Sequence, residues 1–207
     1  MMREIYRQNP CGASSLPFWK AKAITIPENM RIVHDRDFQE AWLSAYDDTP
    51  YFRLLHTLET VDAAHLLPGF RHAAVSDEQL AAHINTCYNA SCVDASELQR
   101  WRERKTYNSA LWVAVCDELT GDVAASGIAE MDPDIGEGVL EWIQVAPAYR
   151  GRQLGRYIVL ELLHRMQGKV QFVTVSGQCN ALTKPEALYR SCGFVGNDVW
   201  HILKHKK

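Results

Sequence analysis

The stretch Glu141-Trp-Ile-Gln-Val145-Ala-Pro147-Ala-Tyr-Arg150-Gly-Arg-Gln-Leu-Gly155-Arg-Tyr-Ile-Val159 decides the fold of this chain. Residues 139–145 have the apolar, β-branched and aromatic content of a buried strand, and Pro147 ends it. From Gly155 onward the apolar residues recur at helical spacing as far as Met166. The sequence therefore predicts a strand, a glycine-bearing turn and a helix in direct succession.

The turn between this strand and this helix predicts a site for an anion. The first N–H groups of a helix have no partner within it, and the helix dipole favours negative charge at that end. Arg150, Arg152 and Arg156 add positive charge at the same place, so a pyrophosphate fits. The chain contains no Gly-x-x-x-x-Gly-Lys-Ser/Thr, and no Gly-x-Gly-x-x-Gly follows a strand. The pattern therefore disfavours a magnesium-bound nucleoside triphosphate and a dinucleotide.

Two short motifs resemble those of one known family. Residues 150–155, Arg-Gly-Arg-Gln-Leu-Gly, resemble motif A of the GCN5-related N-acetyltransferases, Gln/Arg-x-x-Gly-x-Gly/Ala, with Gln153 at the first motif glycine. Downstream, Leu188-Tyr-Arg-Ser-Cys-Gly-Phe194 resembles the Tyr-x-x-x-Gly-Phe signature that closes the acetyl-CoA site in that family. The order of predicted elements between and after the two motifs is similar to the second half of the family fold.

The resemblance implies an α/β fold of the GNAT type, a mixed central β-sheet flanked by helices. It also implies an acyltransferase that moves the acetyl group of acetyl-CoA to a primary amine of a small molecule or a peptide. A second function class stays open, a CoA-binding sensor or scaffold of the same fold without turnover. Gln153 is the only feature that favours it.

The resemblance also assigns roles to residues. Tyr189 takes the position of the general acid that protonates the leaving sulfur, and the strand backbone near Val145 polarises the acetyl carbonyl. Asn180 is expected to contact the pantetheine arm. The expected cofactor-binding residues are Gln144, Val145, Arg150, Gly151, Arg152, Gln153, Leu154, Gly155, Arg156 and Asn180.

Glu141 is the candidate general base. It lies four residues before Val145, so strict alternation of the strand would put both side chains on one face. Glu130 and Glu137 are rivals, because a base also works through one intervening water. The alternative interpretation of Glu141 is an acid that pairs with an arginine or reaches solvent.

Composition sets further expectations. With 207 residues, 47% hydrophobic and 23% charged, the chain has room for one domain, at 67–207, preceded by an extension, at 1–66. A net charge of −3 predicts no general attraction to nucleic acid. The absence of a signal peptide and of a long apolar run predicts no membrane association and a cytoplasmic protein. Six scattered cysteines and eight histidines without zinc-ligand spacing predict no metal. A homodimer is possible.

The remaining elements are expected in a definite order. A capping box at residues 76–79 opens a helix, and 94–104 forms a second helix. Strands are expected at 70–75, 111–115, 122–131, 170–175 and 199–203, and a helix with proline in its first turn begins at residues 183–186. In the extension, strands are expected at 31–34 and 51–58 and a helix at 38–45. The extension either adds strands to the main sheet or packs as a partial second lobe. Its aromatic residues either pack against the core or line a substrate pocket.

Overall fold

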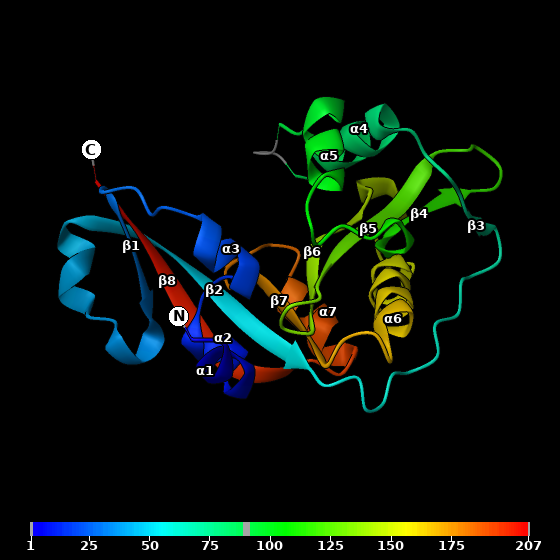
Figure 1. The fold of residues 1–207 in the computed structure, drawn as a ribbon. Coiled ribbons are helices and arrows are strands. Elements are labelled where there is room, and N and C mark those ends of the chain that lie inside the picture. Colours follow the sequence, from blue (N-terminus) through cyan, green and yellow to red (C-terminus); the bar gives the residue numbers. More distant parts are fainter. Residues whose placement is uncertain (1, 89–91, 207) are drawn as a thin grey trace.

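The computed structural model describes residues 2–88 and 92–206, and its centre is an eight-stranded mixed sheet (Figure 1). The strands lie in the order β1-β8-β2-β7-β6-β5-β4-β3. β6 and β7 run parallel, and all other neighbours are antiparallel. The strands are β1 (Met30–His34), β2 (Tyr46–His56), β3 (Phe70–His72), β4 (Trp112–Asp117), β5 (Val123–Asp132), β6 (Glu137–Val145), β7 (Phe172–Gln178) and β8 (Val195–His205).

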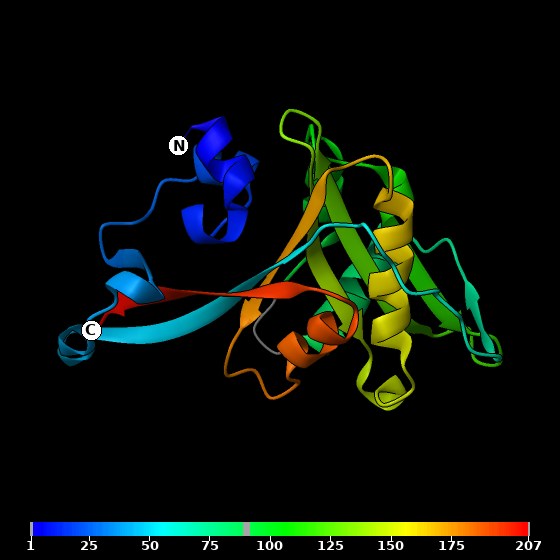
Figure 2. The same cartoon turned by 90° about the horizontal axis from the view of Figure 1, so that it is seen from below.

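Helices cover both faces of the sheet (Figures 1 and 2). α6 and α7 share one apolar core with Val173 and Val175 of β7. Tyr6 and Phe18, from the helices of the extension, pack instead on Phe172. Successive side chains of a strand point to opposite faces of its sheet. The helices of the extension, which pack on Phe172, and α6, which packs on Val173, therefore lie on opposite sides of β7. The helices are α1 (Arg3–Gln8), α2 (Pro10–Ala13), α3 (Phe18–Ala23), α4 (Asp77–Cys87), α5 (Ala95–Arg102), α6 (Leu154–Met166) and α7 (Pro185–Ser191).

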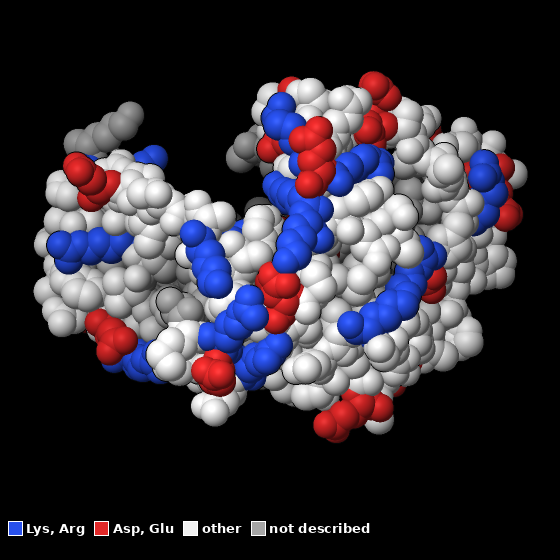
Figure 3. Space-filling view, viewed as in Figure 1, with Lys and Arg blue, Asp and Glu red and all other residues white. Residues whose placement is uncertain are grey.

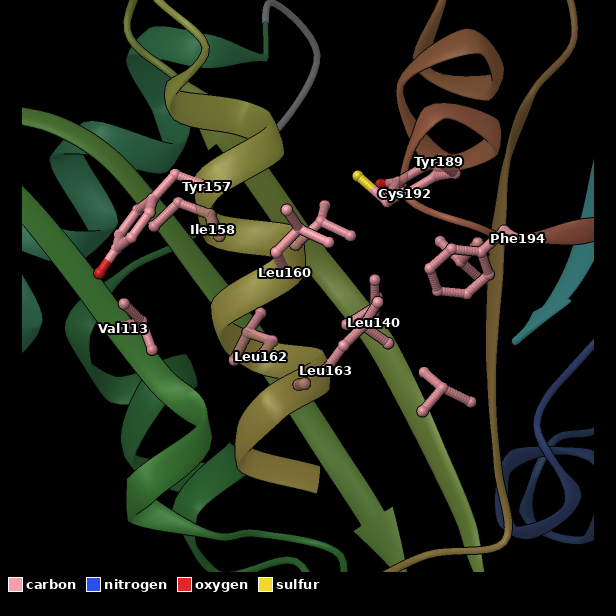
Figure 4. Packing of buried hydrophobic residues seen from close by; sticks show 14 of the residues in the cluster. Val113, Leu140, Tyr157, Ile158, Leu160, Leu162, Leu163, Tyr189, Cys192 and Phe194 are labelled. Carbon is pink, nitrogen blue, oxygen red and sulfur yellow. The ribbon is translucent and has the colours of Figure 1, made fainter. Parts of the chain in front are cut away.

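The main core lies between α6 and the sheet. Ile158, Leu162 and Leu163 of α6 are fully buried there, and Figure 4 shows α6 packed over Leu140 of β6, with Tyr189 and Phe194 beside it. These α6 positions have the helical spacing that the sequence predicts. A second cluster joins α4 and α5 to Ile128 and Trp142 on the other face. One face of the sheet is therefore covered by α6 and α7. The other face is covered by α4 and α5 and by the helices of the extension.

From residue 67 onward the elements follow the predicted order. The capping box is present, because Ser76 Oγ accepts from the Gln79 N–H at 3.2 Å and Gln79 Oε1 accepts from the Ser76 N–H at 2.9 Å. The strand expected at 70–75 is limited to β3. Short 3-10 turns, at Asp35–Asp37 and Glu40–Ser44, replace the helix expected at 38–45. Neither turn has a buried residue, so no packed face stabilises a longer helix there.

The extension adds strands to the main sheet, which is the first of the two arrangements expected for it. β2 lies between β7 and β8, and β1 pairs with the outer side of β8. The sheet thus runs across the predicted boundary after residue 66. Among the described residues, no helix has the length and apolar character needed to cross a membrane.

Buried polar groups fix the extension to the sheet. Glu137 at the start of β6 is fully buried and accepts hydrogen bonds from the Tyr6 hydroxyl at 2.6 Å and the Thr174 hydroxyl at 2.6 Å. It also accepts from the Phe18 N–H at 3.1 Å and pairs with Arg53, whose Nη2 lies 3.2 Å away. Arg53 is itself only 1% exposed. This network joins α1, α3, β2, β6 and β7 without leaving either charge unpaired.

Candidate active site

β6 separates from β7 partway along its length. The parallel pairing of the two strands ends at Leu140 and Val175. β7 continues to pair with β2 as far as Gln178, while β6 continues to pair with β5 as far as Val145. The edge of β6 over residues 141–145 is therefore open toward β7. Its backbone N–H and C=O groups are available to a ligand.

A β-bulge at Glu141 marks the point of separation. Ile128 of β5 lies opposite Trp142, and its neighbour Ala129 lies opposite Leu140, so Glu141 has no residue opposite it. The bulge interrupts the alternation of the strand. Val145 packs with the α6 core, whereas Glu141 Oε2 lies 2.5 Å from Nζ of Lys20 on α3. The expectation that both side chains share one face is wrong, because strict alternation does not hold across a bulge.

A pocket of about 340 Å³, here called the turn pocket, lies at the end of β6. It contains the open strand edge, the turn, the start of α6, the end of α4 and residues of α7. Its lining residues are Cys87, Tyr88, Ile143, Gln144, Val145, Tyr149, Arg150, Gly151, Gln153, Leu154, Gly155, Arg156, Thr183, Pro185, Leu188 and Tyr189. Most of the predicted cofactor-binding residues thus line a single pocket.

The turn presents backbone N–H groups to this pocket. Gly151 has φ +79°, and Gln153, the N-cap of α6, has φ 59° and makes no side-chain cap. Among the described residues, the backbone N–H groups of 151–156 donate to no backbone carbonyl in a loop or turn. The first N–H groups of α6 also have no acceptor within the helix, because no preceding helical turn supplies one. Gln153 adopts the left-handed conformation that a glycine reaches without strain. At position 153 the glutamine thus takes the backbone conformation that a motif glycine would favour.

Gly155 serves a different purpose. A Cβ at this position would lie 3.2 Å from Leu188 Cδ2 and 3.5 Å from Val145 Cγ2. The glycine thus lets the first turn of α6 approach both α7 and β6.

The three arginines of the turn differ in their surroundings. Arg150 lines the pocket and donates from Nε to the Val145 carbonyl at 3.3 Å. Arg156 also lines it, and its Nη2 lies 2.7 Å from Asp62 Oδ2. Arg152 is not among the lining residues, since its guanidinium lies over the Tyr149 ring, 5.3 Å from the centroid. Arg150 and Arg156 therefore supply the positive charge of the pocket itself.

Tyr189 on α7 lines the turn pocket from a buried position. Its ring packs against Phe52 and Phe194, with centroid distances of 6.1 and 5.8 Å, and Figure 4 shows it beside Cys192 near α6. Burial raises the pKa of the Tyr189 hydroxyl well above its ordinary value, and nearby Tyr88 and Cys192 raise it further. The hydroxyl has no hydrogen-bond partner among the described residues. It is therefore a protonated donor in the wall of the turn pocket.

The pocket contains two polar side chains whose positions bear on ligand binding. Gln144 donates from its amide to Ser126 Oγ at 2.5 Å, but its Oε1 is buried with no partner among the described residues. The Tyr88 hydroxyl donates to the Ile143 carbonyl at 2.9 Å and so occupies one acceptor of the open edge. No local sequence pattern predicts the position of Tyr88, because only the fold brings the end of α4 to β6.

The rival acids and Asn180 lie outside this pocket. Both oxygens of Glu137 are engaged in the buried network, so that residue is structural. Glu130 Oε1 accepts from Arg104 at 2.7 Å, and burial together with the charge of Glu141 raises the pKa of Glu130. Asn180 lies in the turn after β7 and does not line the turn pocket. Among the described residues, no group of histidine, cysteine and acidic side chains is placed to hold a metal ion.

The comparison with family models agrees with this geometry. Residues 107–196 match the acetyltransferase (GNAT) domain. Over these residues the chain is similar to the GNAT domain. The matched range includes the bulge, the open edge, the turn and Tyr189, so both sequence motifs lie within it.

Solved structures show the same fold over most of the chain. A GCN5-related N-acetyltransferase from Sphaerobacter thermophilus is 14% identical over 89% of this chain, with a TM-score of 0.69. This chain covers 62% of that protein, which is less than two thirds of its length. A GNAT-family acetyltransferase from Colwellia psychrerythraea is 12% identical and matches 99% of this chain and 72% of its own, with a TM-score of 0.59. A putative GNAT-family acetyltransferase from Novosphingobium aromaticivorans is 14% identical over 89% of this chain and 71% of its own, with a TM-score of 0.55. No curated protein matches the chain by sequence.

Proposed function

We propose that this protein is an N-acetyltransferase that uses acetyl-CoA and acts on a primary amine. One observation carries the proposal: the open edge of β6, the unpartnered N–H groups before α6 and the Tyr189 hydroxyl all meet in the turn pocket. A strand edge binds amides, helix N-terminal N–H groups bind phosphates, and a phenol donates a proton. These are the groups that an acyl thioester of CoA requires.

The residues present fit CoA. The N–H groups of residues 151–156, with Arg150 and Arg156, would hold its pyrophosphate. The open backbone of β6 would hold the pantetheine amides, and the buried Gln144 Oε1 is an acceptor still without a partner. Acetyl-CoA supplies an acyl thioester when bound. A preorganised backbone N–H at the open edge would stabilise the developing oxyanion, a contribution on the order of 3 kcal/mol.

Tyr189 is the proposed general acid and Glu141 the proposed general base. Because the raised pKa of Tyr189 keeps its hydroxyl protonated, the residue can donate to the departing thiolate. Glu141 lies at the bulge, two residues before the pocket-lining Ile143, where β6 leaves β7. In the structure its carboxylate pairs with Lys20. An amine acceptor therefore has to compete with Lys20 for the Glu141 carboxylate.

Thermal unfolding with CoA tests the donor half of the proposal. CoA at a hundredfold excess over its Kd stabilises a fold by about 2.7 kcal/mol, so the midpoint should rise. Arg156→Gln should weaken CoA binding about tenfold, as expected for one charged hydrogen bond. Arg165→Gln on the same helix is the matched control, because Arg165 pairs with Glu161 away from the pocket. An unchanged midpoint at millimolar CoA would contradict the proposal.

Thiol release from acetyl-CoA tests the transfer. The acceptors to compare are polyamines, amino acids, aminoglycosides and short peptides. Release that depends on one amine class, together with mass-spectrometric detection of the acetylated amine, supports an N-acetyltransferase. A protein that CoA stabilises, but that releases no thiol with any of these acceptors, would instead be a CoA-binding sensor or scaffold.

A further inference from the structure

A second pocket, of about 260 Å³, lies on the other face of β6 from α6. We call it the extension pocket and define it by Lys20, Arg53, Glu141, Tyr51, Trp200 and Leu16, which line it. Its walls come from the segment before α3 and from α3, β1 and β2, together with β6, β7 and β8. Figure 3 shows this side of the molecule, where Lys and Arg side chains alternate with Asp and Glu along the middle. The predicted extension therefore forms a large part of a cavity beside the candidate base.

The charged groups of the extension pocket are of both signs. Lys20 Nζ and Glu141 Oε2 are 2.5 Å apart, and both side chains line the pocket. Arg53 lines it as well, and its Nε is buried without a partner among the described residues. The charge of Arg53 is already met by the buried Glu137, so Arg53 forms part of the wall and is not a free cation. The pocket therefore offers one cation, Lys20, to a carboxylate and one anion, Glu141, to an ammonium group.

The rest of the wall is apolar and aromatic. Leu16, Tyr51 and Trp200 contribute to it, and the Trp200 indole N–H is already satisfied by the Cys11 carbonyl at 2.8 Å. An apolar cavity of about 150 Å³ holds a benzene molecule. The volume of the extension pocket is therefore enough for one amino acid with a branched aliphatic or aromatic side chain.

The two pockets meet at β6. Glu141 lines the extension pocket, and Ile143, just beyond the bulge, lines the turn pocket. Between them β6 has no pairing with β7. An amine held by Glu141 thus lies where the open strand edge begins, next to the position proposed for the thioester.

We infer that the extension pocket binds the acceptor and that the acceptor is an apolar α-amino acid. The inference rests on the proposed function. The ligand carboxylate pairs with Lys20, which frees Glu141 to accept the ligand ammonium, and the side chain packs against Tyr51 and Trp200. Binding exchanges the Lys20–Glu141 pair for two new pairs. An amine without a carboxylate has to compete with Lys20 for Glu141 and offers Lys20 no new partner.

The transfer balances in atoms and charge. The ammonium gives one proton to Glu141, the C–N bond forms as the C–S bond breaks, and the thiolate takes the proton of Tyr189. The nitrogen loses its second proton as the amide forms, and that proton restores Tyr189 by way of solvent. One proton in total, the one on Glu141, is released.

Matched acceptors test the inference. L-leucine, L-leucinamide and 3-methylbutylamine share one side chain but differ in the carboxylate, and thiol release is measured for each at saturating acetyl-CoA. We expect kcat/KM for L-leucine to exceed that for the other two by at least about tenfold, as for one charged hydrogen bond. Lys20→Met should remove this preference through KM. Equal or better use of the amide, which resembles a peptide N-terminus, would overturn the inference.

Lys22→Met is the matched control. Lys22 lies on the same helix, but its Nζ lies over the Phe18 ring, 4.4 Å from the centroid, outside the extension pocket. This variant should keep the preference for L-leucine. Both variants should keep the CoA-induced thermal shift. Loss of preference in both variants, or in neither, would overturn the inference.

The same measurements separate the inference from the proposed function. If CoA shifts the thermal midpoint but L-leucine is not acetylated, the inference fails and CoA binding stands. If CoA causes no shift, the proposed function fails as well.

Discussion

The turn pocket and the extension pocket flank the same strand, but they are built in different ways. Most of the turn pocket comes from one continuous segment, 143–156, and much of its polarity is backbone N–H. The extension pocket combines side chains from five strands and from the region of α3, and its polarity lies in Lys20, Arg53 and Glu141. A site built from backbone N–H groups depends less on the identity of its side chains. A site of paired side chains depends on it more, because each charge needs a partner from elsewhere in the chain.

Removal of the Tyr189 hydroxyl should have the largest effect at the turn pocket. Tyr189→Phe keeps the ring packed on Phe52 and Phe194 but removes the proton donor, so turnover should fall by roughly 10² to 10⁴ with CoA affinity nearly unchanged. Steady-state kinetics and CoA binding check this. Tyr157→Phe is the control, since Tyr157 is equally buried and its hydroxyl pairs with His72 outside the pocket. Equal rates in Tyr189→Phe and the parent would remove the acid assignment.

Neutralising Glu137 should weaken the attachment of α1 and α3 to the sheet. Glu137→Gln leaves Arg53 buried without its counter-charge, so the free energy of unfolding should fall by roughly 3–5 kcal/mol. Denaturant unfolding measures the loss. Glu186→Gln breaks a surface pair with Arg190 and should cost less than about 0.5 kcal/mol. Similar small losses in both variants would mean that the buried network does not fix the extension.

Acid should destabilise the packing of α4 on the sheet, because α4 carries the buried His83. Burial lowers the pKa of His83 to about 4, from an unfolded value of about 6.5. The unfolded state therefore binds more protons between these values, and stability falls as pH drops through this window, by roughly 2 kcal/mol between pH 7 and pH 5. Thermal midpoints across pH measure this for the parent and for His83→Gln. A drop of the same size in the variant would assign the pH dependence to other groups.

A glycine at position 153 should have the smallest effect. Gln153→Gly relieves a left-handed backbone but increases the freedom of the unfolded chain, so stability should change by less than about 1 kcal/mol. CoA affinity should be equal or higher, because the N–H groups keep their positions. Gly151→Ala, which places a side chain at φ +79°, should lower stability instead. Loss of CoA binding in Gln153→Gly would show that the glutamine side chain itself binds the ligand.

Local pattern was enough for the C-terminal part of the fold. The capping box at Ser76, the apolar spacing of α6 and the content of β6 involve residues close in the chain, where propensity and burial act together. The helix expected at 38–45 is wrong because none of the residues in that segment is buried in a core. The Glu141 alternation failed because a bulge depends on the pairing of β5 with β6, which no single strand sequence encodes.

The sequence by itself determined the strand, turn and helix around Gly155, the tyrosine of the second motif and the order of elements from residue 67 onward. Each of these depends on neighbours in the chain. Only the tertiary structure decided that β2 enters between β7 and β8, that Glu137 is structural, and that Lys20 meets Glu141. Those contacts join residues that are far apart in the chain, and their geometry comes from the packing of the whole sheet rather than from any local periodicity.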